Sequence, residues 1–410
     1  MARKVGACVL SLSSGRPPFL SQQLLQELEE EKRHDSSGDG DASTNASPAA
    51  LSFAADVGTL LPGKEALKEH SAAHVESDMR SFFGLSASLF VVAQIRSGLL
   101  APPDTSVAKG AGDVVLLSSA MERIAMPLEE YLDLASNVMH ADLTECPYEA
   151  VGPGYSRKHA DRALKRARQW TEKALSWWNQ EDNGARSGQQ LLLPVVGLDE
   201  NAQQRCLEDV RKLAKEAGIA SLGGAESSVG ISLANLRYLD ADTQITRIRK
   251  ARAQAGPDVM LYAVMGTASL PQLVAALAVG ANAVETSLPY MLTKLNTALS
   301  FAVEAEGPGG PLTVNLLDTR LCEDKAPISA GCPCWACERH TRGYMQHLLS
   351  AKELLGQMLL YLHNASMLIR LLEHVRALPS EEDRLAFARA WAPGLSSSLQ
   401  QSETPPQPQV

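Results

Sequence analysis

The sequence predicts a (β/α)8 barrel, an α/β fold, with a zinc-binding subdomain inserted near its C-terminal end. Short apolar runs alternate with helical stretches along most of the chain, which indicates βαβ units and a parallel sheet. No glycine-rich nucleotide fingerprint follows the first strand, which favours a barrel over a doubly wound sheet. A C-x-C-x2-C cluster with a distant histidine is typical of a subdomain held by a metal ion. A chain of 410 residues would also accommodate two domains.

The first strand is expected in the opening stretch MARKVGACVLSLSSG. Its basic tip and short apolar run also resemble the start of a signal peptide, but the run is short and the thiol cluster indicates a reducing compartment. Further strands are expected at residues 89–95, 112–117, 138–141, 191–198, 219–222, 259–264 and 283–286. Helices are expected at residues 127–135, 156–178, 200–217, 241–255 and 270–278.

The domain boundaries follow changes in composition. Residues 1–330 are expected to form the barrel, with a flexible insertion at residues 34–50 that is poor in apolar side chains. Residues 331–378 are expected to form the zinc-binding subdomain and a long helix, and residues 379–395 a terminal helix. The tail at residues 396–410 is rich in serine, glutamine and proline, which predicts disorder. No apolar run approaches the length that spans a bilayer.

The candidate metal ligands are Cys332, Cys334, Cys337 and His363. Thiolates and imidazole hold Zn²⁺ tetrahedrally, and three cysteines with one histidine form a closed structural site that leaves no position for water. A disulfide is the competing interpretation of the cysteines. It is disfavoured because neighbours two residues apart bridge poorly and because the chain has seven cysteines, an odd number. The pattern therefore predicts one structural Zn²⁺.

The position of His363 follows from a predicted helix. Ser350 and Glu353 have the spacing of a capping box, so the helix is expected to begin at Ser350. Leucine and methionine residues between positions 354 and 362 recur at helical spacing, and His363 lies at the edge of the apolar face that they form. The alternative role for this histidine is a core side chain hydrogen-bonded to a backbone carbonyl. The cysteines upstream favour a metal ligand.

The charge of the chain is −9, which is not typical of a nucleic-acid-binding protein as a whole. The segment at residues 157–173 is a local exception. Its basic side chains fall largely on one side of a helix: Lys158, Arg162, Lys165, Arg166 and Arg168. Two interpretations stay open, a solvated helix face and a surface that contacts phosphates.

Functional residues of a (β/α)8 barrel lie where strands end, which here directs attention to residues 223–224, 265–267 and 285–289. The run VMLYAVMGTASLPQLVAALAVGANAVETSLPY at residues 259–290 resembles the queuine/archaeosine tRNA-guanine transglycosylase family. So do MHADLTECP at residues 139–147 and the R-x-Y-x-x-H-L pattern between the metal ligands, and the resemblance covers residues 85–375. It implies a TIM barrel with a zinc subdomain. It also implies exchange of the wobble guanine of tRNA, by an aspartate nucleophile at ribose C1′ and a second aspartate that moves protons.

The chain departs from the family's pattern where that chemistry is done. Glu285 occupies the nucleophile position, and Thr144 occupies the position of an aspartate that reads the base. The D-S-G-G-F-Q motif is absent, and the corresponding stretch is residues 101–121. The V-Q-G-G element reads VGLD at residues 196–199, and a basic stretch reads MLTKLN at residues 291–296. We therefore expect no catalytic residues in this chain, with Glu285 marking the degenerate nucleophile position.

The resemblance then implies the non-catalytic subunit of a heterodimeric queuine tRNA-ribosyltransferase, which pairs with the catalytic subunit and helps to hold tRNA. One alternative is an active transglycosylase that uses Glu285 as its nucleophile. Another is a zinc-stabilised RNA-binding or scaffolding protein outside this chemistry. The thiol cluster predicts a cytoplasmic location, and the resemblance implies peripheral association with the mitochondrial outer membrane.

Overall fold

The computed structural model describes residues 5–12, 17–35, 51–73, 78–95, 114–117, 122–149, 151–152, 154–180, 188–197, 199–219, 222, 227–305, 307–395 and 399. The insertion expected at residues 34–50 lies outside this part of the chain apart from its first two residues, which end a helix. The tail expected to be disordered also lies outside it, apart from Leu399.

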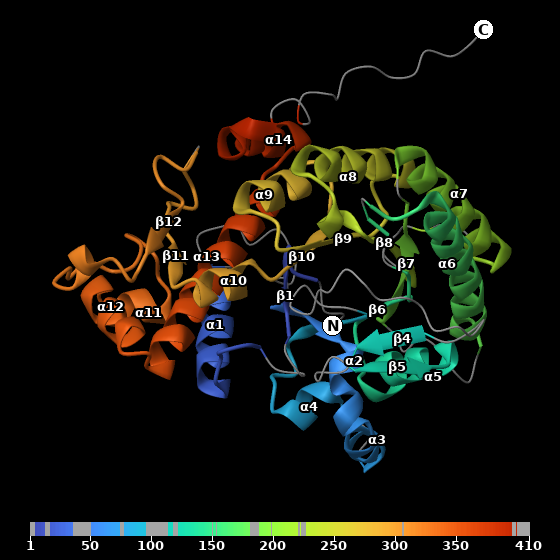
Figure 1. Ribbon diagram of the computed structural model, residues 1–410, viewed down its shortest axis with the longest axis horizontal. Helices are drawn as coiled ribbons and strands as arrows, with labels where there is room; N and C mark the ends of the chain where they lie inside the picture. Colours follow the sequence, from blue (N-terminus) through green and yellow to red (C-terminus); the bar gives the residue numbers. More distant parts are fainter. Residues whose placement is uncertain are drawn as a thin grey trace, which may run out of the picture.

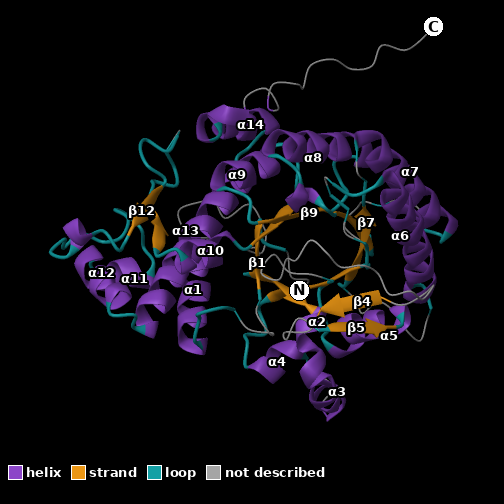
Figure 2. Cartoon of the chain, in the orientation of Figure 1, coloured by secondary structure: helices purple, strands orange, loops and turns teal. Residues whose placement is uncertain are grey.

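Among the described residues, eight parallel strands close into a barrel (Figures 1 and 2). The order around the barrel is β1-β10-β9-β8-β7-β6-β3-β2, and β1 closes it by pairing with both β10 and β2. The predicted fold class is therefore confirmed. The strands are β1 (Cys8–Ser11), β2 (Ser52–Asp56), β3 (Phe90–Gln94), β6 (Leu143–Glu145), β7 (Gln190–Val195), β8 (Val229–Leu233), β9 (Leu261–Gly266) and β10 (Ala283–Thr286).

Side chains fill the lumen of the barrel. Val9, Val92, Leu143, Leu192 and Tyr262 belong to one buried cluster that draws on strands all around the barrel. Because successive side chains of a strand point to opposite faces, the intervening residues face outward, where a larger apolar cluster joins the strands to the helices. The barrel is thus a packed core, and its chemistry is confined to its ends.

Helices surround this barrel. Those before the C-terminal region are α1 (Gln22–Asp35), α2 (Val57–Leu60), α3 (Lys64–Ala73), α4 (Met79–Phe83), α5 (Leu128–Asp133), α6 (Arg157–Trp178), α7 (Glu200–Glu216), α8 (Ala241–Ala255), α9 (Leu270–Ala278) and α10 (Leu288–Lys294). Ser156, Asp199 and Asp240 begin α6, α7 and α8 by accepting hydrogen bonds from first-turn amides. Among the described helices, none has both the length and the apolar character needed to cross a membrane.

A small subdomain lies beside the barrel, on the left in Figure 1. Its antiparallel strands are β11 (Thr297–Leu299) and β12 (Thr313–Asn315), and its helices are α11 (Trp335–Arg339) and α12 (Arg342–Ser350). The long helix α13 (Leu354–Ala377) packs on α11, α12 and β11 and also on α9, α10 and β1 of the barrel. The last helix of the chain's described part is α14 (Glu381–Trp391), apart from one short turn, and it packs on α9.

The strand predicted at residues 138–141 is wrong. Val138 ends a π-helix (Leu134–Val138) that continues α5, and the barrel strand β6 begins five residues later at Leu143. Met139 and Ala141 are fully buried, so this apolar run reflects packing of a turn. His140, with φ of 51°, reverses the chain between the helix and the strand.

Other strands differ from the prediction in place or partner. The strand expected at residues 112–117 is β4 (Val114–Leu117), but it forms an antiparallel hairpin with β5 (Arg123–Met126) outside the barrel. The strand expected at residues 219–222 falls partly outside the described residues, and its described ends are not strand. The strand that pairs with both β7 and β9 is β8, which the pattern missed, as it missed β2.

The helix expected to begin at Ser350 begins later. Ser350 is the last residue of α12, where its hydroxyl contacts the side chain of Gln346, and Glu353 directly precedes α13. Lys352 has φ of 59°, a left-handed conformation that separates the two helices. The Ser350–Glu353 spacing therefore marks the end of one helix and the start of the next.

Candidate metal centre and candidate active site

The predicted metal ligands converge on one buried point. Nδ1 of His363 lies 3.7 Å from Sγ of Cys332, 3.5 Å from Sγ of Cys334 and 3.3 Å from Sγ of Cys337. The four ligand atoms all lie within 4.8 Å of one another. A tetrahedral ion with bonds of ~2.3 Å to sulfur and ~2.0 Å to nitrogen separates such atoms by about 3.5 Å. The four side chains therefore form a site that fits a tetrahedral metal ion.

Local structure explains how the ligands reach this point. Cys334 begins α11 and its sulfur accepts a hydrogen bond from the amide of Cys337, so both thiols face the same side. His363 lies in the middle of α13, fully buried, and its Nε2 donates to the carbonyl of Leu299 in β11 at 2.8 Å. This contact fixes the ring and leaves Nδ1 for the metal. The hydrogen bond to a backbone carbonyl that is expected of a core histidine is thus present. It is made by Nε2, whereas Nδ1 faces the cysteines.

Glu285, which the resemblance places at the family's nucleophile position, lies near the carboxyl end of β10 and is fully buried. Its Oε1 accepts a hydrogen bond from Ser11 Oγ of β1 at 2.5 Å, and its Oε2 accepts one from the backbone amide of Gly266 at the end of β9 at 3.1 Å. The register between β10 and β9 shifts at this point, after Glu285. The carboxylate therefore joins β10 to both neighbouring strands.

A second carboxylate, Glu145, ends β6 and is also fully buried. It accepts a hydrogen bond from Ser232 Oγ of β8 through Oε1, and its Oε2 has no partner among the described residues. Burial raises the pKa of Glu145 to about 7, although the Ser232 hydrogen bond and the charge of Arg237 act to lower it. The pKa of the buried Arg237 is raised, because the electrostatic effects of Tyr148, Glu285, Tyr238 and Glu145 together outweigh the effect of burial.

Two other positions of the family pattern, Thr144 and Asp199, do not direct their side chains toward Glu285 and Glu145. Thr144 turns away from the lumen, because its hydroxyl lies 3.2 Å from that of Ser136 in the π-helix. Asp199 is used as the cap of α7, where it accepts from the amide of Ala202 at 2.8 Å. Residues 223–224, and residues 101–121 apart from β4, lie outside the described residues. Thr144 and Asp199 are thus both engaged elsewhere in the fold.

The candidate tRNA-contacting residues lie on α6, on the far side of the barrel from the metal centre (Figure 1). Lys158, Arg162 and Lys165 are exposed. Arg166 pairs with Glu149 at 3.1 Å, and Arg168 pairs with Asp209 at 3.2 Å. Two of the five cations are therefore already neutralised within the fold.

Glu145 and Arg237 were missed by sequence reasoning. Glu145 is the last residue of β6, and its position at the carboxyl end of a barrel strand could have identified it as a candidate site residue. Arg237 lies in a short helix (Leu236–Tyr238) directly after β8, so recognition of that strand would have brought it to the carboxyl end of the barrel.

The metal centre should be essential for the stability of the subdomain. Exchange of Cys334 for serine removes one soft ligand, so we expect Cys334→Ser to lose bound metal and to lower the free energy of unfolding by about 4 kcal/mol or more. Elemental analysis and chemical unfolding measure the two effects. Cys322→Ser is the control, because Cys322 is exposed and outside the cluster. Full metal content in Cys334→Ser would refute this role.

Glu145 should give the folded chain a measurable pH dependence. Its pKa rises from 4.5 to about 7 on folding, so between these values the folded state binds more protons than the unfolded state. The free energy of unfolding therefore falls as the pH rises through this window, by about 3 kcal/mol from this group. Glu145→Gln should abolish that fall in urea unfolding between about pH 4 and about pH 8. The exposed control Glu216→Gln should retain it, and an unchanged slope in Glu145→Gln would contradict the assignment.

Comparison with known proteins identifies the family. The family model described as "Queuine tRNA-ribosyltransferase" matches residues 104–395. A protein of that name from Gloeobacter violaceus is 26% identical over 59% of this chain and 58% of its own length. One from Prochlorococcus marinus is 29% identical over 65% and 63%. A "Queuine tRNA-ribosyltransferase accessory subunit 2" from Culex quinquefasciatus is 29% identical over 52% and 48%.

The chain spans about three-fifths of the length of the bacterial relatives that it matches. The family model, in contrast, extends from the β4–β5 hairpin through the barrel strands β6 to β10, the metal centre and α14. That match covers more than half of the chain, and the converging cysteines and histidine lie within it. The chain belongs to the queuine tRNA-ribosyltransferase family.

Proposed function

We propose that this chain is the non-catalytic subunit of a heterodimeric queuine tRNA-ribosyltransferase. It supports exchange of the wobble guanine of tRNA for queuine by pairing with a catalytic relative and positioning the tRNA. The observation that carries this proposal is the state of Glu285, which is buried and accepts hydrogen bonds at both carboxylate oxygens. A nucleophile must approach its target to about 3–3.5 Å in the correct orientation. The carboxylate of Glu285 is instead committed to its neighbouring strands.

An active transglycosylase that uses Glu285 is the second candidate. Bacterial relatives named as the enzyme itself favour it, and glutamate serves as a glycosyl nucleophile in other enzymes. The structure offers this alternative little support, because Thr144 replaces a base-reading aspartate and faces Ser136 instead of the lumen. Relatives from Culex quinquefasciatus and Anopheles gambiae that are named as accessory subunits favour the first candidate.

We propose that the metal is one structural Zn²⁺. Among the described residues, three thiols and one imidazole form the donor set, and all four residues are buried. This donor set is typical of closed zinc sites that stabilise a fold and perform no chemistry. Reduced thiols of this kind support a cytoplasmic location. Peripheral association with the mitochondrial outer membrane stays part of the proposal on the resemblance alone.

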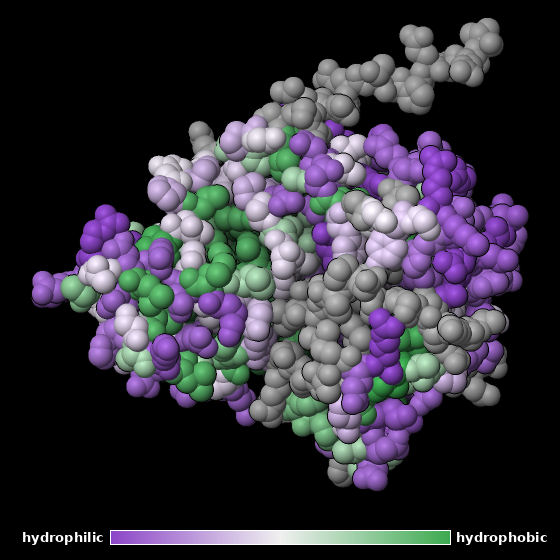
Figure 3. Space-filling view, in the orientation of Figure 1, coloured by the Kyte–Doolittle hydropathy of each residue, from purple (hydrophilic) through white to green (hydrophobic). Residues whose placement is uncertain are grey.

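The exposed apolar surface supports a subunit interface on the metal-binding side of the molecule. Large hydrophobic side chains are exposed on α10, on α12, at the start of α13 and near them: Met291, Leu295, Leu317, Tyr344, Leu354 and Leu355. Figure 3 shows apolar residues on this side, over the subdomain and α10. Tyr344 also stacks on His340 with ring centroids 5.1 Å apart. Exposed clusters that contain aromatic residues are typical of protein interfaces, and the proposed partner is the catalytic relative.

The basic side of α6 is the proposed tRNA contact. Lys158, Arg162 and Lys165 are exposed and free of carboxylate partners within the described residues. Arg166 and Arg168 would have to exchange their carboxylate partners for phosphates, so we expect them to contribute less to tRNA binding. Such contacts position tRNA without reading its sequence.

The state of Glu285 provides the test of this function. In an assay of labelled guanine exchange into tRNA, the chain alone should be inactive and its mixture with the catalytic relative active. Glu285→Gln should leave the activity of the mixture within about twofold of wild type, whereas loss of a true nucleophile lowers rates by about 10⁴-fold or more. The matched control is the same exchange at the nucleophile of the catalytic subunit. Exchange by this chain alone would overturn the proposal.

Leu354 provides the test of the interface. Its side chain is 65% exposed at the start of α13, so a charge there should be tolerated by the fold but not by an apolar contact. We expect Leu354→Asp to weaken the heterodimer at least about tenfold in sedimentation velocity. Ala253→Asp is the control, since Ala253 is exposed on α8, away from this surface. Equal dissociation constants for both variants would place the interface elsewhere.

A further inference from the structure

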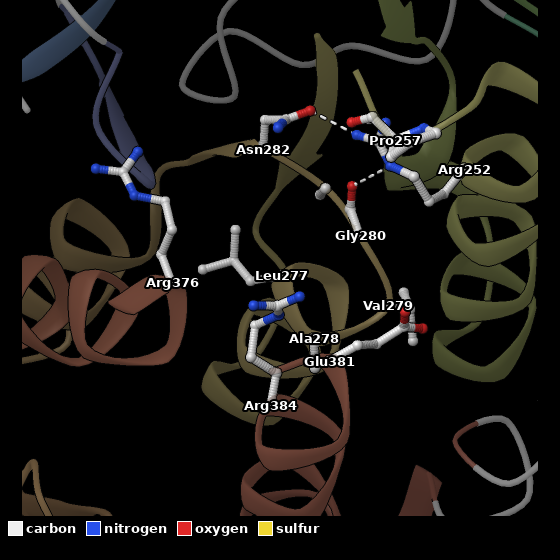
Figure 4. A pocket seen from close by; sticks show the side chains of 11 residues that line it. Arg252, Pro257, Leu277, Ala278, Val279, Gly280, Asn282, Arg376, Glu381 and Arg384 are labelled. Atoms are coloured by element: carbon white, nitrogen blue, oxygen red, sulfur yellow. Dashed lines mark hydrogen bonds between the residues drawn. The ribbon is translucent and has the colours of Figure 1, made fainter. Parts of the chain in front are cut away.

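A cavity lies at the end of the barrel opposite the candidate active site (Figure 4). It has a volume of about 290 Å³ and lies between the α9–β10 loop, the C-terminal end of α13 and the first turn of α14. Asn282, one of its lining residues, directly precedes β10, whereas Glu285 lies near the carboxyl end of that strand. The volume falls near the lower end of the range of small-molecule pockets.

The lining of the cavity is cationic over an apolar floor. Arg252, Arg376 and Arg384 line it, and Glu381 is the one acidic residue among the lining residues. The floor comes from the end of α9 and the loop after it: Leu277, Ala278, Val279 and Ala281. Burial lowers the pKa of Arg249 outside the cavity, and the charge of Glu381 opposes this effect.

Arg252 builds the wall of the cavity. It donates from Nε to the carbonyl of Gly280 at 2.8 Å and from Nη1 to the carbonyl of Gly256 at 2.6 Å. It also donates to the side chain of Asn282 at 2.5 Å. Gly280 permits this approach, because its φ is 111° and a Cβ atom there would lie 2.6 Å from Cγ of Arg252. The donors of Arg252 are thus occupied, and it contributes its charge.

Among the arginines that line the cavity, Arg384 has hydrogen-bond donors that are not used within the described residues. Its Nη1 donates to the carbonyl of Leu378 at 3.2 Å, and within the described residues its Nε and Nη2 make no hydrogen bond. Figure 4 shows its guanidinium directed toward Leu277, a residue that lines the cavity. Arg376, in comparison, is tied to the carbonyl of Val5 at 2.7 Å and to the carboxylate of Glu373. Arg384 is therefore the group that would meet a ligand, and the positive charge of Arg252 adds to its own.

We propose that this cavity binds a phosphate group, either as the free anion or as the monoester of a small organic molecule. A guanidinium presents parallel donors that match two phosphate oxygens, and phosphate is the anion whose tetrahedral oxygens address cations from several directions. Here the cations come from α8, α13 and α14. The apolar floor beside Arg384 accommodates the organic part of a monoester.

Calorimetric titration of the full chain tests this site. The probes are inorganic phosphate and glycerol 3-phosphate, with sodium chloride at the same ionic strength as the reference. We expect saturable binding in wild type and a loss of at least about tenfold in affinity in Arg384→Gln, because one charge-assisted hydrogen-bonded pair is removed. Arg384→Lys should fall between them, since it keeps the charge without the paired donors. Tighter binding of glycerol 3-phosphate would identify the monoester, and equal binding the free anion.

The control is Arg389→Gln, an exposed arginine on the same helix that does not line the cavity. It should bind the probes as wild type does. Thermal unfolding without phosphate checks that each variant is folded, and Arg384→Lys replaces Arg384→Gln if the latter unfolds. No binding beyond that of chloride, or the same loss in Arg389→Gln, would overturn the proposal.

Discussion

The hydrogen bond from His363 to Leu299 is the contact on which the C-terminal half of the fold depends. It orients the ring so that the other nitrogen faces three sulfurs, and the next residue strengthens the same junction. Asn364 accepts from the amide of Leu299 at 2.8 Å and donates to the carbonyl of Thr297 at 3.0 Å. Two consecutive residues of α13 thus hold β11, and α13 itself packs on α9, α10 and β1. The metal cluster, the small sheet and the barrel wall are therefore one mechanical unit.

This coupling explains why a metal site would persist in a chain that, as we propose, has no catalytic residues. Loss of the metal would leave buried thiols and a buried imidazole without a common partner, inside a junction that shapes the surface around Leu354 and Tyr344. The surface proposed to bind the partner depends on that junction for its shape. Selection for pairing alone would then maintain the cysteines and the histidine, whatever happens at the barrel mouth.

Much of the fold could be predicted from the sequence, because local patterns determine it. The helices at residues 241–255 and 270–278 and the strand at residues 283–286 have the predicted bounds, and their apolar periodicity is clear. Strand β8 was missed because Gly230 and Ser232 interrupt its apolar run. A Cβ at Gly230 would lie 2.9 Å from Cβ of Met260, so close packing against the neighbouring strand requires the residue that weakens the signal. The strand prediction at residues 138–141 was wrong for the opposite reason. The run is apolar like a strand, but its apolar residues are buried in a turn.

The metal centre was predictable because its spacing is encoded within a short stretch and one helix. The barrel mouth was predictable only in part. Glu285 was found from its strand end, but its role depends on Ser11, more than 200 residues earlier in the chain, and on the amide of Gly266, contacts that only barrel closure creates. Arg237 could not be placed without β8, so its charge beside both glutamates was invisible in the sequence.

The hydrogen bonds of Glu285 explain how a glutamate at this position stabilises the barrel. Its extra methylene, relative to aspartate, lets one carboxylate reach Ser11 on β1 and the amide of Gly266 on β9 while the backbone stays in β10. It does so where the register between β10 and β9 shifts, a point at which regular backbone pairing is interrupted. A buried carboxylate with two donors stabilises such a junction, whereas one kept free for attack on a ribose would leave it unpaired. The side chain of Glu285 thus forms part of the barrel's closure, which supports the proposal that this chain acts through its surfaces.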